Sequence, residues 1–231
     1  MYFDPLWVML ALPGMLLSMW ASFRVKSTFD RYSRVPSRRG LSGAEAAREL
    51  IRQRGVPGVR IEETQGFLSD HYDPRERVLR LSPDVYHGRS LAAIGVAAHE
   101  AGHAVQHARE YGPLALRSMV VKPAMIGSNL GTMLAGLGLF VHSIGLVWVG
   151  VVLFSAFVLF TLITLPVEFD ASRRAIVAIQ EIGIVSSDEA EGASAVLRAA
   201  AMTYVAAAIT AVMQLLYFLI RSGLLGSRRE E

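Results

Sequence analysis

The sequence predicts a mainly α-helical membrane protein with about four transmembrane helices and a small cytoplasmic α+β domain. Hydrophobic residues make up 52% of its 231 residues, which is more than soluble domains usually contain. Charged residues are absent from three long runs, residues 5–23, 123–167 and 199–220. Because about 20 apolar residues cross a bilayer, these runs fit one span, a two-span hairpin and one further span.

The first apolar run is interpreted as a retained transmembrane anchor, residues 5–23. A cleaved signal peptide is the alternative, but the preceding segment MYFDP has an acid where such peptides carry Lys or Arg. The transmembrane hairpin, residues 119–167, is expected to turn near His142. We expect cytoplasmic helices over residues 168–198 and a last transmembrane helix over residues 199–221.

The distribution of basic residues predicts the orientation in the membrane. Of the 23 Lys and Arg residues, 17 lie between Arg24 and Lys122, whereas the hairpin turn has none. Loops rich in Lys and Arg stay in the cytoplasm, so we expect the domain of residues 24–118 there and the amino terminus outside.

Composition also excludes several classes of function. The net charge of +3 does not indicate nucleic-acid binding, because the basic residues gather beside the predicted spans and no basic stripe alternates with aromatic residues. The absence of Cys excludes disulfides, thiolate zinc sites and a cysteine nucleophile. The expected non-protein partner is therefore the lipid bilayer.

The cytoplasmic domain is expected to mix helices and short strands. The segment LSGAEAARELIRQRG is typical of an amphipathic helix, with Ser42 and Glu45 at capping-box spacing and Gly55 at its end. GVRIEE and RVLRLS are predicted strands, the second at a sheet edge. Ser90 is expected to cap a helix over residues 91–109.

The segment GVAAHEAGHAVQHA, residues 95–108, contains the candidate chemistry. His99 and His103 are four residues apart, so both lie on one helix face, with Glu100 at its edge. This spacing suits a zinc ion held by two imidazoles, with a carboxylate beside it to take a proton from bound water. The neighbours are small and uncharged, and Gly102 leaves room for close packing. Two core histidines with a salt-bridged glutamate are the alternative interpretation.

A catalytic zinc ion needs a third protein ligand, and His107, Glu168 and Asp170 are the candidates. His107 lies eight residues after His99, about 80° around a helix of 3.6 residues per turn, which favours packing, substrate contact or support of a ligand. Glu168 ends the long uncharged run, and a tight hairpin would return it beside the motif helix. This return favours Glu168 as the ligand, although a carboxylate at a helix start is the alternative.

Two segments, DHYDPRERVLRLSPDVYHGRSLAAIGVAAHEAGHAVQHA and TLPVEFDASRRA, resemble the YugP-type neutral zinc metallopeptidases of bacterial membranes. The order of zinc helix, membrane hairpin and helix with the third ligand is similar to that of the HtpX-like and CAAX prenyl proteases. The resemblance implies a zincin-like (gluzincin) domain that binds Zn²⁺ through His99, His103 and Glu168, with Glu100 as the catalytic residue. In the HtpX-like pattern an Asp stands four residues after the glutamate that corresponds to Glu168.

Here Ser172 occupies that position, so acidic support of the zinc site depends on Asp170, and both Asp170 and Ser172 stay open as the supporting residue. The implied function is a zinc-dependent metalloendopeptidase of the bacterial cytoplasmic membrane, with a multi-pass chain and an active site facing the cytoplasm. Zinc would activate a water, and Glu100 would act as general base and then general acid.

The expected substrate is a polypeptide, namely a membrane protein or its cytoplasmic segment, bound as an added strand beside RVLRLS. Candidate partners for the oxyanion are His71, His107, Arg173 and Tyr204. The alternative function is a catalytically silent membrane scaffold or adaptor braced by a fully coordinated zinc ion, which His107 as a fourth ligand would favour.

Overall fold

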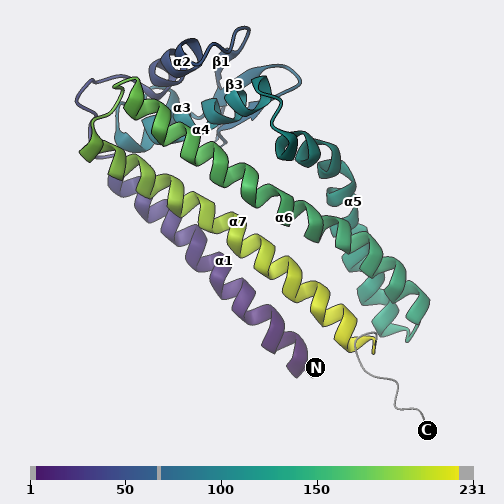
Figure 1. Cartoon of the computed structure of the whole chain (residues 1–231). Helices are drawn as coiled ribbons and strands as arrows, with labels where there is room; N and C mark the ends of the chain where they lie inside the picture. The colour runs from purple at the N-terminus through teal and green to yellow at the C-terminus, as the bar shows by residue number, and fades with distance from the viewer. Residues whose placement is uncertain (1–3, 67–68, 224–231) are drawn as a thin grey trace. The chain divides into compact units, whose positions relative to one another are not determined.

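The computed structural model describes residues 4–66 and 69–223, and this part of the chain is mainly helical with one small sheet (Figure 1). The predicted mainly helical fold is confirmed. The elements are, in chain order, α1 (Pro5–Tyr32), α2 (Gly43–Gln53), β1 (Arg60–Glu63), β2 (His71–Asp73), β3 (Val78–Leu81), α3 (Pro83–Tyr86), α4 (Leu91–Ala108), α5 (Gly112–Phe140), α6 (Ile144–Glu181) and α7 (Ser187–Arg221).

Among the described residues, four helices are long and apolar enough to cross a membrane, namely α1, α5, α6 and α7. Only 11% to 33% of the most apolar stretch of each helix is buried, so most of its apolar side chains face outward. So much exposed apolar surface is energetically unfavourable in water but favourable in contact with lipid. The predicted number of candidate membrane helices is therefore confirmed.

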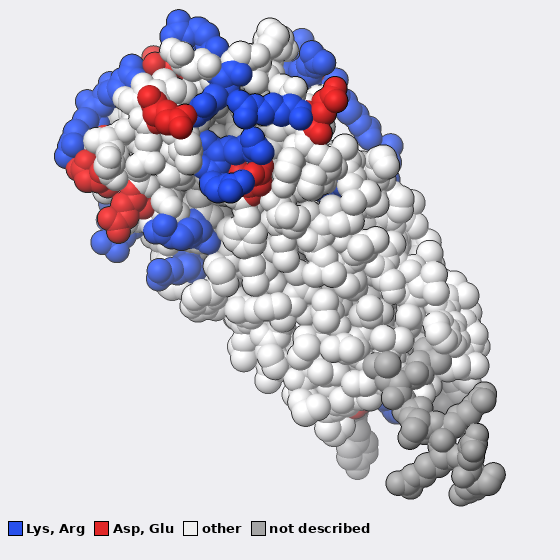
Figure 2. Space-filling model, viewed as in Figure 1, with Lys and Arg blue, Asp and Glu red and all other residues white. Residues whose placement is uncertain are grey.

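The chain forms two compact units, which are described separately. The apolar helical unit consists of residues 4–20, 116–165 and 203–223, and the α+β unit consists of residues 21–115 and 166–202. Figure 2 shows a broad uncharged surface and a region crowded with charged side chains. The described part of the apolar helical unit contains four charged side chains, which are Asp4, Arg117, Lys122 and Arg221.

Small residues bring the helices of the apolar helical unit into close contact. A Cβ atom on Gly138 of α5 would lie 2.6 Å from the backbone nitrogen of Val147 in α6. The two helices are joined at residues 141–143, where the sequence predicts the turn and where His142 has φ 56°. In the same unit Ser18 of α1 lies 3.3 Å from Thr210 of α7 between their hydroxyl oxygens. Such small-residue contacts are typical of helix packing in membranes.

The sheet of the α+β unit has the strand order β1-β3-β2, with β1 parallel and β2 antiparallel to β3. The predicted strands GVRIEE and RVLRLS correspond to β1 and β3, but the prediction that RVLRLS lies at an edge is wrong. The residues His71–Asp73, interpreted as part of a turn, instead form β2 and pair with β3. The central position of β3 therefore leaves β1 and β2 as the edges.

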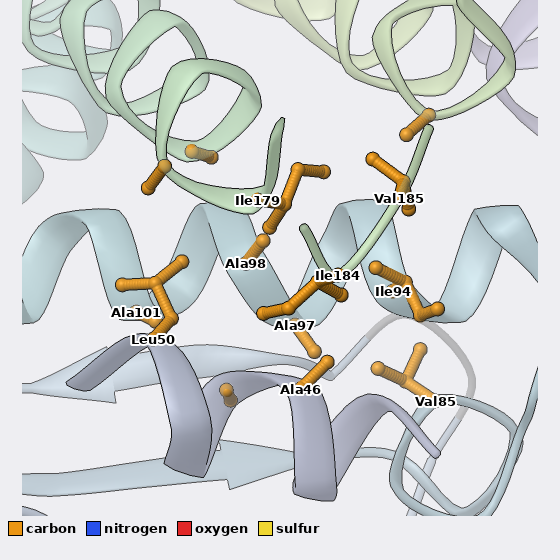
Figure 3. Packing of buried hydrophobic residues seen from close by; sticks show 14 of the residues in the cluster. Ala46, Leu50, Val85, Ile94, Ala97, Ala98, Ala101, Ile179, Ile184 and Val185 are labelled. Carbon is orange, nitrogen blue, oxygen red and sulfur yellow. The ribbon is translucent and has the colours of Figure 1, made fainter. Parts of the chain in front are cut away.

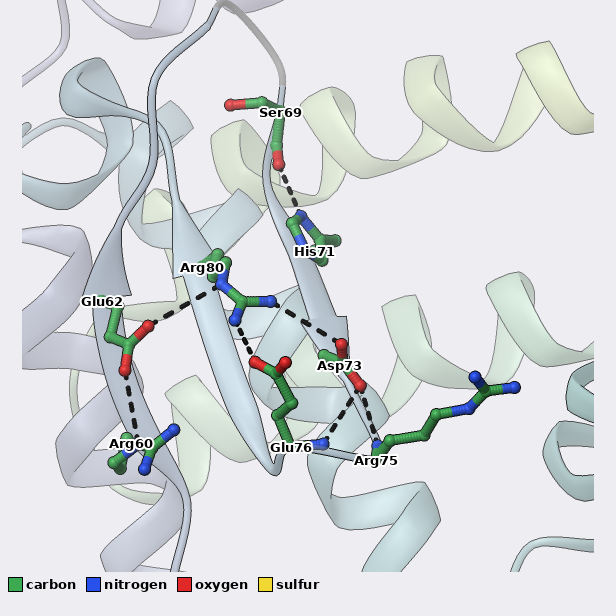
Figure 4. Close-up of polar contacts among 8 residues, drawn as sticks. All are labelled: Arg60, Glu62, Ser69, His71, Asp73, Arg75, Glu76 and Arg80. Carbon is green, nitrogen blue, oxygen red and sulfur yellow. Dashed lines mark hydrogen bonds and ion pairs between the residues drawn. The ribbon is translucent and has the colours of Figure 1, made fainter.

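Arg80 of the central strand links the two edges on the polar face of the sheet (Figure 4). Its guanidinium lies 3.7 Å from a carboxylate oxygen of Glu62 in β1 and 3.7 Å from one of Asp73 in β2. It also pairs with Glu76 in the β2–β3 turn. These exposed pairs contribute little to stability individually, but together they help to define the register of three short strands.

The core of the α+β unit surrounds α4 (Figure 3). Ala97, Ala98 and Ala101 are fully buried, and their small side chains let neighbouring elements approach the helix closely. Leu50 of α2 and Ile179 of α6 pack in the same cluster. The predicted capping box of α2 is also present: Ser42 accepts from the Glu45 backbone, and the Glu45 carboxylate accepts from the Ser42 backbone. The helix with the candidate motif is thus packed against several elements of the unit.

Candidate metal centre

Three side chains predicted as ligands lie together in the α+β unit. His99 and His103 extend from α4, and Glu168 extends from α6. One candidate ligand atom from each lies within 4.8 Å of the others. Oε2 of Glu168 lies 3.2 Å from Nε2 of His99 and 3.7 Å from Nε2 of His103. The side chains are 13%, 9% and 2% exposed for His99, His103 and Glu168, so the donor atoms converge on one largely enclosed volume.

A close approach of α6 to α4 brings Glu168 to this position. A Cβ atom on Gly102 would lie 2.8 Å from the backbone oxygen of Ala171, so only glycine allows this contact without a shift. The predicted packing role of Gly102 is confirmed. Glu168 lies within α6, which continues from Ile144 to Glu181 through Pro166. The alternative interpretation of Glu168 as a carboxylate at a helix start is wrong, because no helix begins there.

Gln106, a residue that the sequence analysis did not single out, orients the His103 ring. Its amide nitrogen donates to the backbone oxygen of Val167 at 3.0 Å and to Oδ2 of Asp170 at 2.9 Å. Both amide hydrogens are thereby used, so the amide oxygen faces Nδ1 of His103, 3.0 Å away, and must accept its proton. With hydrogen on Nδ1, the Nε2 lone pair of a neutral His103 points toward the Glu168 carboxylate.

Ser172 supports the other histidine directly, since its hydroxyl oxygen lies 3.1 Å from Nδ1 of His99. The sequence left open whether Asp170 or Ser172 supports the site, and the structure shows that Asp170 contacts His103 only through Gln106. Ser172 thus stands where the HtpX-like pattern has an Asp, and its neutral hydroxyl group makes the contact to His99.

The donor set fits a divalent metal ion such as Zn²⁺. A nitrogen lone pair that faces a carboxylate oxygen is repelled unless a proton or a metal ion lies between them. Burial by itself lowers the pKa of His103, but its contact with Glu168 and the negative charges of Glu100 and Glu168 raise that pKa above its ordinary value. The cluster thus favours a positive charge. Two imidazole nitrogens and one carboxylate oxygen match the ligands of catalytic zinc sites, which leave a fourth position for water.

Glu100 lies next to His99 and is half-buried. Its carboxylate makes no hydrogen bond or ion pair with any residue in the ranges 4–66 and 69–223. Burial raises the pKa of Asp70, the residue before β2, and the negative charge of Glu100 raises that pKa further. A half-buried carboxylate without a partner in the described ranges, beside a candidate metal site, is suited to proton transfer.

The remaining candidates do not join the ligand cluster. Nδ1 of His107 lies 2.9 Å from the Tyr72 hydroxyl, and within the described ranges His107 is outside the group of possible metal ligands. His71 Nδ1 lies 2.8 Å from the backbone oxygen of Ser69 (Figure 4). Tyr204 belongs to the apolar helical unit. Tyr72 was missed because β2 was interpreted as a turn, although its alternation of polar and aromatic residues is a weak strand signal.

Comparison with known proteins agrees with this geometry. Residues 7–223 match the model of a protein family described as "Putative neutral zinc metallopeptidase". The chain belongs to this family. It is also similar to the "Putative membrane protease YugP" of Bacillus subtilis (strain 168), with 46% identity over 215 residues that cover 93% of this chain and 96% of that protein. No solved structure matches the chain. The resemblance to the YugP-type family that the two motifs indicated is confirmed.

Proposed function

We propose that this protein is a zinc-dependent metalloendopeptidase of the cell membrane, with zinc bound by His99, His103 and Glu168 and with Glu100 as the catalytic residue. The observation that carries the proposal is the convergence of these three donor groups beside a half-buried carboxylate that has no partner in the described part of the chain. The family match and the similar relative support both the metal and the peptidase chemistry.

Different residues have different roles in the proposed hydrolysis of a peptide bond. His99, His103 and Glu168 would hold the zinc ion, which when bound would supply Lewis acidity toward water and a peptide carbonyl group. The Glu100 carboxylate accepts the proton of the attacking water and then donates it to the amine that leaves, so it acts first as base and then as acid. Gln106 and Ser172 hold the two imidazole rings in the orientation that directs their Nε2 atoms inward.

Tyr72 is the proposed donor to the oxyanion that develops during attack. Its hydroxyl oxygen lies 2.9 Å from Nδ1 of His107, which is on the same helix as the two histidine ligands. If His107 donates its Nδ1 proton to this oxygen, the tyrosine O–H is left to donate to the substrate. Burial raises the pKa of Tyr72, so the hydroxyl keeps its proton at neutral pH.

The proposed location is the cytoplasmic side of a bacterial cytoplasmic membrane. The basic residues next to the candidate spans between Arg24 and Lys122 support this orientation, because Lys and Arg close to a span favour the cytoplasmic side. A zincin-like active site at that position would act on a membrane protein or on its cytoplasmic segment. The edge strand available for an extended substrate near the site is β2, which carries Tyr72, rather than β3.

Glu100→Gln separates the peptidase from a zinc-braced scaffold. Purified variant protein in detergent is expected to keep its zinc but to lose cleavage of an unfolded polypeptide such as casein, because the amide cannot accept a proton. Glu191→Gln provides a matched control, since Glu191 is exposed on α7. A wild-type protein that holds zinc but never cleaves would support the scaffold instead. The three candidate protein ligands found among the described residues, rather than four, favour the enzyme.

A further inference from the structure

A basic pocket lies between α2, α4 and α6 in the α+β unit, apart from the metal centre. Its volume is about 340 Å³, and four arginines line it, which are Arg54, Arg109, Arg173 and Arg174. Figure 2 shows Lys and Arg side chains gathered around a hollow in the charged region of the surface. On α4 the pocket is lined at Gly102 and Val105, which lie about 100° around the helix from the face of the two histidines.

Acidic groups do not neutralise this pocket. Glu181 pairs with Arg54 at 2.5 Å. Asp170, behind the pocket, pairs with both Arg173 and Arg174. Four guanidinium groups therefore face two carboxylates, which leaves an excess of two positive charges.

Arg109 is the clearest unused donor. Its exposed side chain makes no hydrogen bond or ion pair with the part of the chain that the structure describes. Each guanidinium group has five N–H donors, so the four groups together have far more donors than two carboxylates can accept from. The pocket thus presents several unsatisfied donors toward one volume.

Two of the four arginines, Arg54 and Arg174, are also held in place before any ligand binds. Asp170, only 7% exposed, bonds to Arg174, whose guanidinium carbon lies 5.5 Å from the centre of the Tyr111 ring. Glu181, which also lines the pocket, holds Arg54. Positioned donors lose less conformational entropy on binding than free ones, so the pocket is prepared for an anion.

We propose that this pocket binds a phosphate group, carried by an anionic lipid or free in solution. A phosphate group presents oxygens in several directions and can accept from guanidinium groups on three separate elements, whereas a carboxylate accepts mainly in one plane. Lipid headgroup and free phosphate share this chemistry. The proposal is independent of peptidase activity, because binding itself is the measurement.

The test uses the full-length protein and the variant Arg109→Gln. Binding of inorganic phosphate is measured by calorimetry in neutral detergent. Binding of lipid is measured by thermal unfolding in nanodiscs of phosphatidylcholine, with or without phosphatidylglycerol. Loss of one charged donor is expected to weaken binding roughly three- to tenfold. Arg52→Gln is the matched control, because Arg52 is an exposed residue of α2 outside the pocket and its replacement removes the same charge.

A second variant keeps the test decisive if the first does not fold. Arg109→Lys retains the charge but not the fork of donors, so its affinity is expected to lie between those of wild type and Arg109→Gln. A response to phosphate alone identifies a free anion, and a response to phosphatidylglycerol alone identifies a lipid headgroup. The proposal is overturned if neither ligand binds, or if Arg52→Gln weakens binding as much as Arg109→Gln.

Discussion

Replacement of Gln106 by Met tests whether the hydrogen bond to His103 determines the affinity for zinc. The variant fills nearly the same volume but loses three hydrogen bonds, to His103, Val167 and Asp170. The Val167 carbonyl lies inside α6 and keeps its helical partner, and Asp170 keeps its arginine pairs. The group left without a partner is therefore the Nδ1 proton of His103.

The cost of this unpaired proton is expected to appear in metal binding. Metal binding through Nε2 fixes the His103 ring, so in the variant it holds the Nδ1 hydrogen beside the methionine side chain, which offers no comparable acceptor. A buried unpaired donor costs about 1–3 kcal/mol, which corresponds to about 5- to 150-fold in a dissociation constant. Loss of a partner behind a metal ligand typically weakens affinity about 10- to 100-fold, in the same range.

The assay is a competition titration with a chromophoric zinc chelator in detergent, with circular dichroism to check that the variant is folded. Gln180→Met on the exposed surface of α6 is the matched control and should bind zinc like wild type. If Gln106→Met binds zinc within about twofold of wild type while folded, orientation of His103 by Gln106 is not important for the site.

Three further outcomes follow from the geometry. Gly102→Ala places a methyl group 2.8 Å from a backbone oxygen of α6, so it should lower the free energy of unfolding by about 1–3 kcal/mol and weaken zinc binding. Gly136→Ala, whose added methyl group would meet no neighbouring atom within 4 Å, should do neither. Thermal unfolding compares the two variants, and equal stability would contradict the close approach of α4 and α6. Because the pKa of His103 is raised and zinc must displace its proton, the affinity for zinc should fall as the pH is lowered. In a series of zinc titrations at different pH values, the fall should begin above the ordinary histidine pKa of about 6.5. A fall confined to lower pH would refute the raised pKa of His103. Tyr72→Phe should lower kcat about 100- to 1000-fold without loss of zinc, and unchanged cleavage would limit Tyr72 to packing against His107.

Local features of the sequence predicted most helices and the histidine pair. Long uncharged runs, the capping residues Ser42 and Ser90, and the turn at His142 all act through neighbours along the chain, so they could be interpreted without a structure. The pairing of short strands could not. β2 has three residues, too few for a clear alternation, and its pairing with β3 depends on the hairpin between them.

The candidate site shows the same division. His99 and His103 are one helical turn apart, so their common direction follows from the period of the helix. Gln106 lies three residues after His103, and its role depends on Val167 and Asp170, which are more than 60 residues away in the chain. Such a buried network is defined by several distant partners at once, and no local pattern reveals it.

The sequence by itself determined the apolar helices, the helix with the histidine pair and the neighbouring glutamate, because helix period and hydrophobic length are properties of consecutive residues. Only the tertiary structure decided how near Glu168 comes to the two imidazoles, which hydrogen bonds orient these rings, and which arginines gather in the separate basic pocket. The physical reason is that these features depend on the contact of α4 with α6, where the missing side chain of Gly102 allows two backbones to approach.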